Sequence, residues 1–141
     1  VLSACSFNVS FVVMNTSNAP LEVEYVVTSA VNSLENTSNK PYKTTVSNWN
    51  KWFFKEDWNE VPQDQYEFDP KTRKCKIKLA PNEVLKFMWI NDSTFINEDD
   101  ANVHVENLRL SGVNGEIFYE GKRFYKQFER KNDINYFVTY R

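Results

Sequence analysis

The sequence predicts an all-β protein, built as an antiparallel sandwich of two sheets with about eight or nine strands. Three observations predict it. Short segments of alternating apolar and polar residues recur along the 141 residues, and they are rich in aromatic and β-branched side chains. Asn, Pro and Gly separate these segments at the spacing expected of turns. Aromatic residues make up 16% of the chain, which excludes a disordered protein.

The first two strands are predicted at residues 7–13 and 21–27. In the first, Phe7, Val9, Phe11 and Val13 form one face, and in the second Leu21, Val23, Tyr25 and Val27 do so. The six residues that connect these strands, 15–20, predict a hairpin. The polar stretch 29–43 that follows predicts a loop.

The aromatic stretch 44–58 fits neither the helical nor the strand period. A strand over residues 51–55 is the preferred interpretation, because aromatic side chains favour the surface of a sheet. A short helix over residues 46–54 is the alternative. On the strand interpretation Trp52 and Phe54 share a face and are predicted to lie in the core.

The second half of the chain contains the clearest alternation. Cys75, Ile77 and Leu79 alternate with lysines, which predicts a half-buried strand with a basic outer face. Residues 80–83 predict a turn, and residues 84–90 are apolar enough for a central strand. Further strands are predicted at 103–110, 116–119, 122–129 and 134–140, with a turn at 112–115 and hairpin loops at 120–121 and 131–133.

This set of strands is similar to an immunoglobulin-like sandwich. The Cys…Trp…Cys spacing of antibody domains is absent, so the similarity concerns architecture alone. The chain has 17 asparagines and three glycines, which predicts that asparagine takes over the left-handed turn positions. The asparagines at predicted strand boundaries are Asn15, Asn18, Asn82, Asn114 and Asn132.

The opening residues Leu2-Ser3-Ala4-Cys5 resemble the lipobox of bacterial lipoproteins, in which an apolar residue and two small ones precede a cysteine. The resemblance implies that residues 1–5 end a signal peptide with Cys5 as the lipidated residue. Residues 6–141 would then form a single sandwich domain, lipid-anchored in the bacterial cell envelope at the outer membrane or the periplasmic face. Alternatively, residues 1–5 simply begin the first strand.

The two cysteines leave three possibilities open. A lipidated Cys5 would leave Cys75 as a free core residue. A disulfide between Cys5 and Cys75 would close a loop worth roughly 4 kcal/mol. Two unpaired thiols are the third possibility. Lipidation and the disulfide exclude one another, because each uses the same sulfur.

Four Asn-x-Ser/Thr triplets would be glycan acceptors in a secreted eukaryotic protein, whereas in a bacterial protein they would carry no meaning. They begin at Asn8, Asn15, Asn36 and Asn91.

The residues needed for catalysis are scarce. The single histidine, His104, lies between two valines of an alternating segment and is predicted to face solvent. No His/Cys spacing matches a zinc site, and no glycine-rich loop could bind phosphate. A net charge of −2 gives no field that would attract nucleic acid. The sequence therefore predicts no enzyme, no cofactor, no bound metal and no nucleic-acid partner.

Two surfaces are candidates for binding a ligand or a protein partner. Trp49 and Trp58 are flanked by polar residues and are predicted to be exposed, where they could stack on sugars or anchor a protein. Asp99 and Asp100 belong to an acidic loop over residues 91–102. The lysine face of residues 74–78 is interpreted as a solvated sheet surface.

Together these features predict a non-enzymatic lipoprotein that acts as a binding or accessory subunit of a membrane-associated protein complex, with an envelope protein as its partner. A carbohydrate-binding module that uses Trp49 and Trp58 to hold a glycan is one alternative. The other is an immunity or inhibitor protein against an envelope-targeted toxin or hydrolase, with the loop around Asp99 as its plug.

Overall fold

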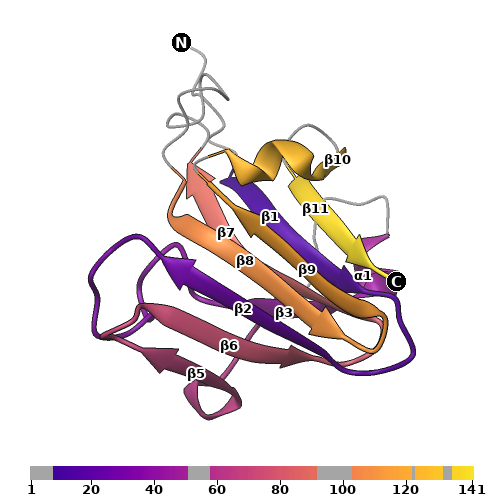
Figure 1. The fold of residues 1–141 in the computed structure, drawn as a ribbon, viewed down its shortest axis with the longest axis horizontal. Coiled ribbons are helices and arrows are strands. Elements are labelled where there is room, and N and C mark those ends of the chain that lie inside the picture. The colour runs from indigo at the N-terminus through magenta and orange to yellow at the C-terminus, as the bar shows by residue number, and fades with distance from the viewer. Residues whose placement is uncertain (1–7, 51–57, 92–102, 122, 132–134) are drawn as a thin grey trace.

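The computed structural model describes residues 8–50, 58–91, 103–121, 123–131 and 135–141, and within them it has eleven strands in two facing sheets (Figure 1). The six-stranded sheet contains, in spatial order, β10 (Glu129–Lys131), β11 (Asn135–Tyr140), β1 (Asn8–Asn15), β7 (Glu83–Asn91), β3 (Tyr42–Thr45) and β4 (Asn59–Glu60). The five-stranded sheet contains β5 (Tyr66–Asp69), β6 (Lys74–Leu79), β2 (Leu21–Val27), β8 (Val105–Gly112) and β9 (Gly115–Glu120). The predicted all-β two-sheet sandwich is confirmed.

Neighbouring strands pair antiparallel, except that β1 and β11 run parallel. The predicted central strand at residues 84–90 is confirmed, since β7 lies between β1 and β3. The turn predicted at residues 112–115 closes the β8–β9 hairpin, where Gly112 pairs with Gly115. Gly115 has a φ of 109°, which a residue with a Cβ rarely adopts.

The main core lies between the sheets and is formed by the inward residues of alternating strands. Cys75, Ile77 and Leu79 of β6 are buried there, as the alternation predicts. Phe11 of β1 stacks on Tyr136 of β11, with ring centroids 5.1 Å apart. Cys75 is a free, buried thiol, and burial raises its pKa to about 12.

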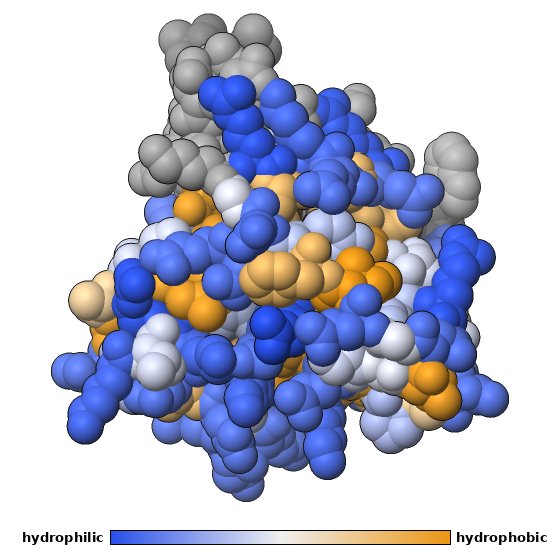
Figure 2. Space-filling model, in the orientation of Figure 1, coloured by the Kyte–Doolittle hydropathy of each residue, from blue (hydrophilic) through white to orange (hydrophobic). Residues whose placement is uncertain are grey.

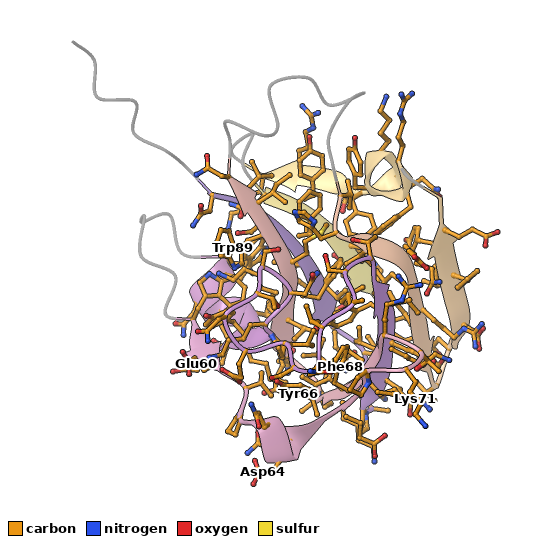
Figure 3. All side chains as sticks on the ribbon, turned by 90° about the vertical axis from the view of Figure 1, so that its left-hand side faces the viewer. Glu60, Asp64, Tyr66, Phe68, Lys71 and Trp89 are labelled. Atoms are coloured by element: carbon orange, nitrogen blue, oxygen red, sulfur yellow. The ribbon has the colours of Figure 1, made fainter. Side chains whose placement is uncertain are left out.

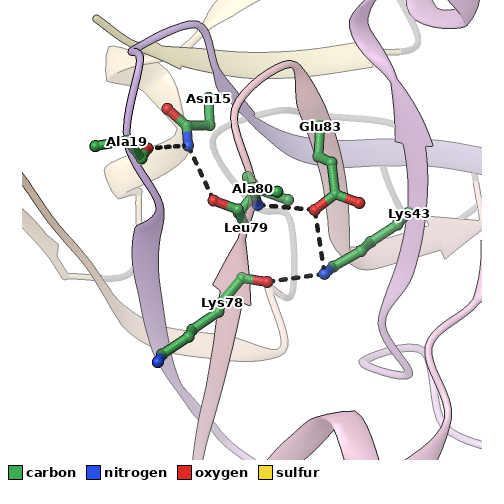
Figure 4. Close-up of polar contacts among 7 residues, drawn as sticks. All are labelled: Asn15, Ala19, Lys43, Lys78, Leu79, Ala80 and Glu83. Carbon is green, nitrogen blue, oxygen red and sulfur yellow. Dashed lines mark hydrogen bonds and ion pairs between the residues drawn. The ribbon is translucent and has the colours of Figure 1, made fainter.

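The predicted hairpin between the first two strands is wrong, because β1 and β2 belong to different sheets. β1 is occupied on both sides by β11 and β7, so the chain leaves it through residues 16–20 and crosses to the other sheet. Asn15 supports this crossing: its Nδ2 donates to the carbonyls of Ala19 and Leu79, both at 2.9 Å (Figure 4). Asn15 is 0% exposed, so its side chain cannot accept a glycan.

A second crossing, from β6 back to β7, lies beside the first. The Asn82 N–H donates to the Asn15 carbonyl at 2.7 Å, and Asn82 has the left-handed φ of 65° predicted for a turn asparagine. The Glu83 carboxylate accepts from the Ala80 N–H at 2.7 Å and from Lys43 Nζ at 3.4 Å (Figure 4). These bonds hold the two crossings at one end of the sandwich.

Among the residues that the structure describes, three helical turns interrupt the strands: α1 (Val46–Trp49) and the 3₁₀ helices η1 (Gln63–Gln65) and η4 (Phe124–Gln127). The strand predicted at 122–129 is wrong over the η4 residues, since Phe124 and Tyr125 are adjacent in sequence and both buried. A strand would point them to opposite faces. The chain then returns to the six-stranded sheet through β10, so residues 120–121 are no hairpin either. Within the described residues no helix is long and apolar enough to cross a membrane.

The predicted loop at 29–43 ends two residues early, because β3 begins at Tyr42. Leu34 of this loop is buried in the core. Lys40 holds the loop to its surroundings through ion pairs with Glu35 at 2.7 Å and Glu60 at 3.2 Å. In Figure 3 the molecule is seen edge-on: Glu60 and Trp89 lie on the side of the six-stranded sheet and Lys71 on the side of the five-stranded sheet.

Candidate functional site: an aromatic cluster on the six-stranded sheet

The six-stranded sheet carries a second, smaller hydrophobic cluster on its outer face, away from the main core. Val12 and Met14 of β1 and Val84 of β7 form its floor. They are apolar residues at positions that would face solvent in a sheet covered on one side only. The outer face is therefore built to be covered.

Trp49 covers this floor. The helix α1 that carries it follows Thr45, whose Oγ1 caps the helix by accepting from the Asn48 N–H at 3.2 Å. The turn folds Trp49 onto Val12, Met14 and Val84, and its side chain is 1% exposed.

The predicted exposure of Trp49 is thus wrong. Asn48 and Asn50, the polar neighbours that suggested it, follow the helical turn and do not share the direction of the tryptophan side chain. Immediate neighbours in sequence point in other directions in a helical turn and in a strand alike, so polar neighbours do not report the exposure of the residue between them.

Trp58 lies next to Trp49 at the edge of the cluster and is half-buried. Their ring centroids are 6.2 Å apart at an interplanar angle of 64°, an edge-to-face contact. Phe137 of β11 contacts Trp49 from the other side, at 6.1 Å and 67°. The structure therefore brings the two predicted tryptophans together, with one beneath the surface and one at it.

Two lysines lie over the aromatic rings. Lys86 of β7 has its Nζ 4.7 Å from the centroid of the Tyr42 ring and 4.8 Å from that of Trp58. Lys131 of β10 has its Nζ 4.4 Å from the Trp49 centroid and also donates a hydrogen bond to the Trp49 carbonyl. Each such cation–π contact is worth about 0.5–1 kcal/mol at an exposed site. Together, Tyr42, Trp49, Trp58, Phe137, Lys86 and Lys131 are called here the outer aromatic cluster.

The cluster has the chemistry of a contact surface. Aromatic rings bordered by cations favour flat apolar or π-rich partners with acidic groups at the rim. A sugar-stacking platform needs an open ring face, and the buried Trp49 offers none. His104, the single histidine, is half-buried where the chain enters β8.

The lysine face predicted on β6 is confirmed, but it belongs to a self-compensating surface. Across the five-stranded sheet, acidic and basic residues lie opposite one another: Glu24 of β2 lies opposite Lys76 of β6 and Arg109 of β8. We call this surface the charge ladder; its members are Glu67 and Asp69 (β5), Lys74, Lys76 and Lys78 (β6), Glu22 and Glu24 (β2), Arg109 (β8), and Glu116 and Glu120 (β9). Figure 2 shows this side of the molecule to be largely hydrophilic, with only small hydrophobic areas.

The other predicted site residues lie outside the part of the chain that the structure describes. They are Cys5, Trp52, Phe54, Asp99 and Asp100.

Sequence reasoning missed four members of the outer aromatic cluster: Tyr42, Lys86, Lys131 and Phe137. Lys86 carried a signal, since it is the single charged residue in the otherwise apolar run 84–90. A lysine in a central strand needs a place where its charge is either solvated or held by π systems. Tyr42 and Lys131 lie in segments predicted as loops and carried no such signal.

The search for relatives ends without a match: none was found among protein families, curated proteins or solved structures.

Proposed function

We propose that this protein is a non-enzymatic binding or accessory subunit of a membrane-associated protein complex in the bacterial cell envelope, and that the outer aromatic cluster contacts its partner. The observation that carries the proposal is the cluster itself: half-buried Tyr42, Trp58 and Phe137 with lysines over the rings, on a sheet face. Tyr and Trp are among the side chains that dominate binding energy at protein interfaces.

The anchoring part of the proposal is supported by the lipobox-like residues 2–5. β1 begins at Asn8, three positions after Cys5. An acyl chain on Cys5 would therefore hold the sandwich close to the membrane surface, with little freedom to extend away from it. A partner embedded in, or attached to, the same membrane suits that position.

The contacts that the two tryptophans already make favour a protein partner over a glycan. Trp49 is covered, and the Trp58 ring already has Lys86 above it and the Trp49 ring against it. A glycan would have to displace these contacts to stack on Trp58. A protein surface can instead extend the cluster by packing around its rim.

Site-specific photocrosslinking tests the partner surface. A photoreactive phenylalanine analogue in place of Trp58, in the full-length protein in its own host, should give a discrete adduct with an envelope protein. The matched control carries the analogue at Lys71, which is exposed in the turn between β5 and β6, away from the outer aromatic cluster. Equal adducts from both positions, or none from position 58, would count against the proposal. Intrinsic fluorescence shifts on adding envelope glycans would favour the carbohydrate alternative.

Fractionation tests the anchor separately. The full-length protein should be found with the membranes and carry a lipid mass on Cys5, and Cys5→Ser should release it. Cys75→Ser is the control, because that thiol is buried in the core. Retention of Cys5→Ser at the membrane without lipid would contradict the anchor while leaving the partner surface to stand on its crosslinks.

A further inference from the structure

The four sheet edges of the sandwich are unequal. β4, β10 and β5 end their sheets with two, three and four residues, and short edges limit unwanted pairing with other chains. β9 ends the five-stranded sheet with six residues and no proline (Figure 1). It is the longest edge among the described strands.

The outward main-chain groups of β9 follow from the register. The Val27 N–H of β2 donates to Arg73, on the β6 side, at 2.9 Å. The N–H and C=O groups of successive residues point to opposite sides of a strand, so the even-numbered residues of β2 bond to β8. The β8 residues that pair with them point toward β2. The β8 residues between those therefore bond to the odd-numbered residues of β9. The main-chain groups of Glu116, Phe118 and Glu120 therefore point away from β8. No described residue donates to or accepts from them.

The side chains of these three residues share the outer face of the sheet and are exposed. Phe118 is 44% exposed, with the Arg109 guanidinium 5.1 Å from its ring centroid. Glu116 pairs with Arg109 at 3.2 Å, whereas Glu120 has no ion pair within the described part of the chain. The edge thus presents an exposed aromatic ring between two carboxylates.

The charge ladder indicates what would fit beside this edge. Glu67, Lys76, Glu24 and Arg109, which lie opposite one another on β5, β6, β2 and β8, alternate in sign, and the charged residues of β9, Glu116 and Glu120, are both acidic. A sixth strand that continues the alternation is basic. A second copy of the chain fits poorly, because antiparallel pairing of two β9 strands about Phe118 would place Glu116 opposite Glu120 of the other copy.

We propose that β9 binds an extended segment of a partner protein by strand addition, and that this segment carries a basic, an apolar and a basic residue at alternate positions. Main-chain bonds to Glu116, Phe118 and Glu120 would supply affinity, and the two carboxylates and the Phe118 ring would select the sequence. This surface lies on the other sheet from the outer aromatic cluster, so the inference stands independently of the function proposed above.

The test is an NMR titration of the full chain with the synthetic peptide Thr-Lys-Thr-Val-Thr-Lys-Thr, compared with the same peptide carrying Glu in place of Lys. Amide shifts should centre on residues 115–120 with the basic peptide and be absent with the acidic one. The double variant Glu116→Lys, Glu120→Lys should weaken the basic peptide at least about tenfold and bind the acidic one instead. Glu67→Lys, the same charge change on the opposite edge of the same sheet, should leave binding unchanged.

Phe118→Pro tests strand addition itself. Proline removes an outward N–H and no bond to β8, so the variant should fold and lose at least about tenfold in affinity. Phe118→Ala removes the ring but keeps the N–H, so it separates the contribution of the ring to binding from that of the main chain. Its melting curve shows whether the β8–β9 hairpin tolerates a substitution at this position. The proposal is overturned if the basic peptide does not bind, if its shifts lie elsewhere, if the charge swap leaves the preference unchanged, or if Phe118→Pro binds like Phe118→Ala.

Discussion

The two outer faces of the sandwich differ: one is apolar and covered by an aromatic side chain, and the other is charged. The six-stranded sheet places Val12, Met14 and Val84 outward and covers them with Trp49. The five-stranded sheet places charged residues outward, where opposite charges face one another across neighbouring strands. A covered face contributes burial free energy, whereas a solvated ladder contributes specificity of pairing and little stability. Stability is therefore concentrated at the aromatic face, whereas the charged face keeps its sheet surface hydrophilic.

Trp49→Ala should produce the largest change. Removing a fully buried tryptophan costs about 3–5 kcal/mol, because the cavity left over the β1–β7 floor cannot fully collapse. Urea unfolding followed by far-UV circular dichroism measures the loss. Phe118→Ala, an aromatic truncation on the charged face, should stay within about 1 kcal/mol of wild type. A small effect at Trp49 would mean that the face is not covered as described.

The stability of the protein should fall at alkaline pH, because Cys75 lies on the buried face of the five-stranded sheet. Burial raises the pKa of Cys75 to about 12, above its usual value near 9. As pH rises through 9, the unfolded chain loses this thiol proton while the folded protein keeps it, so the free energy of unfolding falls between pH 9 and 12. The loss at pH 10 should be about 1–2 kcal/mol.

Cys75→Ala removes this contribution and is the control, since buried tyrosines such as Tyr25 also have raised pKa values and titrate at higher pH. Parallel pH curves for wild type and Cys75→Ala, measured by urea unfolding, would show that the thiol is not held protonated by the fold. Slow reaction of wild-type Cys75 with a thiol reagent in the absence of urea is the accompanying observation expected.

Lys86→Met compares cations on the two faces. Methionine keeps the apolar stem and removes the charge over Tyr42 and Trp58, so the free energy of unfolding should fall by about 0.5–1 kcal/mol. Lys76→Met, on the charge ladder, should change it by less than about 0.5 kcal/mol. Equal losses at the two positions would remove the distinction between a cation held by rings and a solvated one.

The smallest effect is expected within the charge ladder. A double-mutant cycle on Lys74 and Glu24, whose charged atoms are 2.8 Å apart, should give a coupling of about 0.5 kcal/mol. The coupling should shrink as NaCl is raised toward 1 M. A coupling above about 2 kcal/mol that resists salt would show that the ladder, too, is a structural element.

Particular segments show how far sequence patterns reach. The alternation of Cys75, Ile77 and Leu79 with lysines predicted both sides of β6, because a strand in a sandwich has one dry and one wet face. The same logic failed at residues 124–127, where consecutive buried aromatics need a helical turn. The hairpin over residues 7–27 failed for another reason: a six-residue connection is long enough either to reverse direction within a sheet or to cross to the next one.

The candidate site was predictable only in part. Trp49 and Trp58 were identified as a pair, and the structure brings them into contact. Their exposure was misjudged, and the lysines over the rings were missed, because Lys86 and Lys131 come from strands 45 residues apart in sequence. No local sequence pattern predicts which lysine will lie beside which aromatic ring.

The sequence by itself determined the class of this protein: alternation, aromatic content and asparagine-marked turns specify short strands with one apolar face, and such strands must pair into sheets that pack against each other. The tertiary structure alone decided which sheet each strand joins, that Asn15 is a buried bridge between two crossings, and that Trp49 is covered. The physical reason is the distance along the sequence between the residues that interact. Patterns within a few residues report the direction of side chains along a strand, whereas strand partners, cation–π contacts and free edges depend on residues distant in the chain.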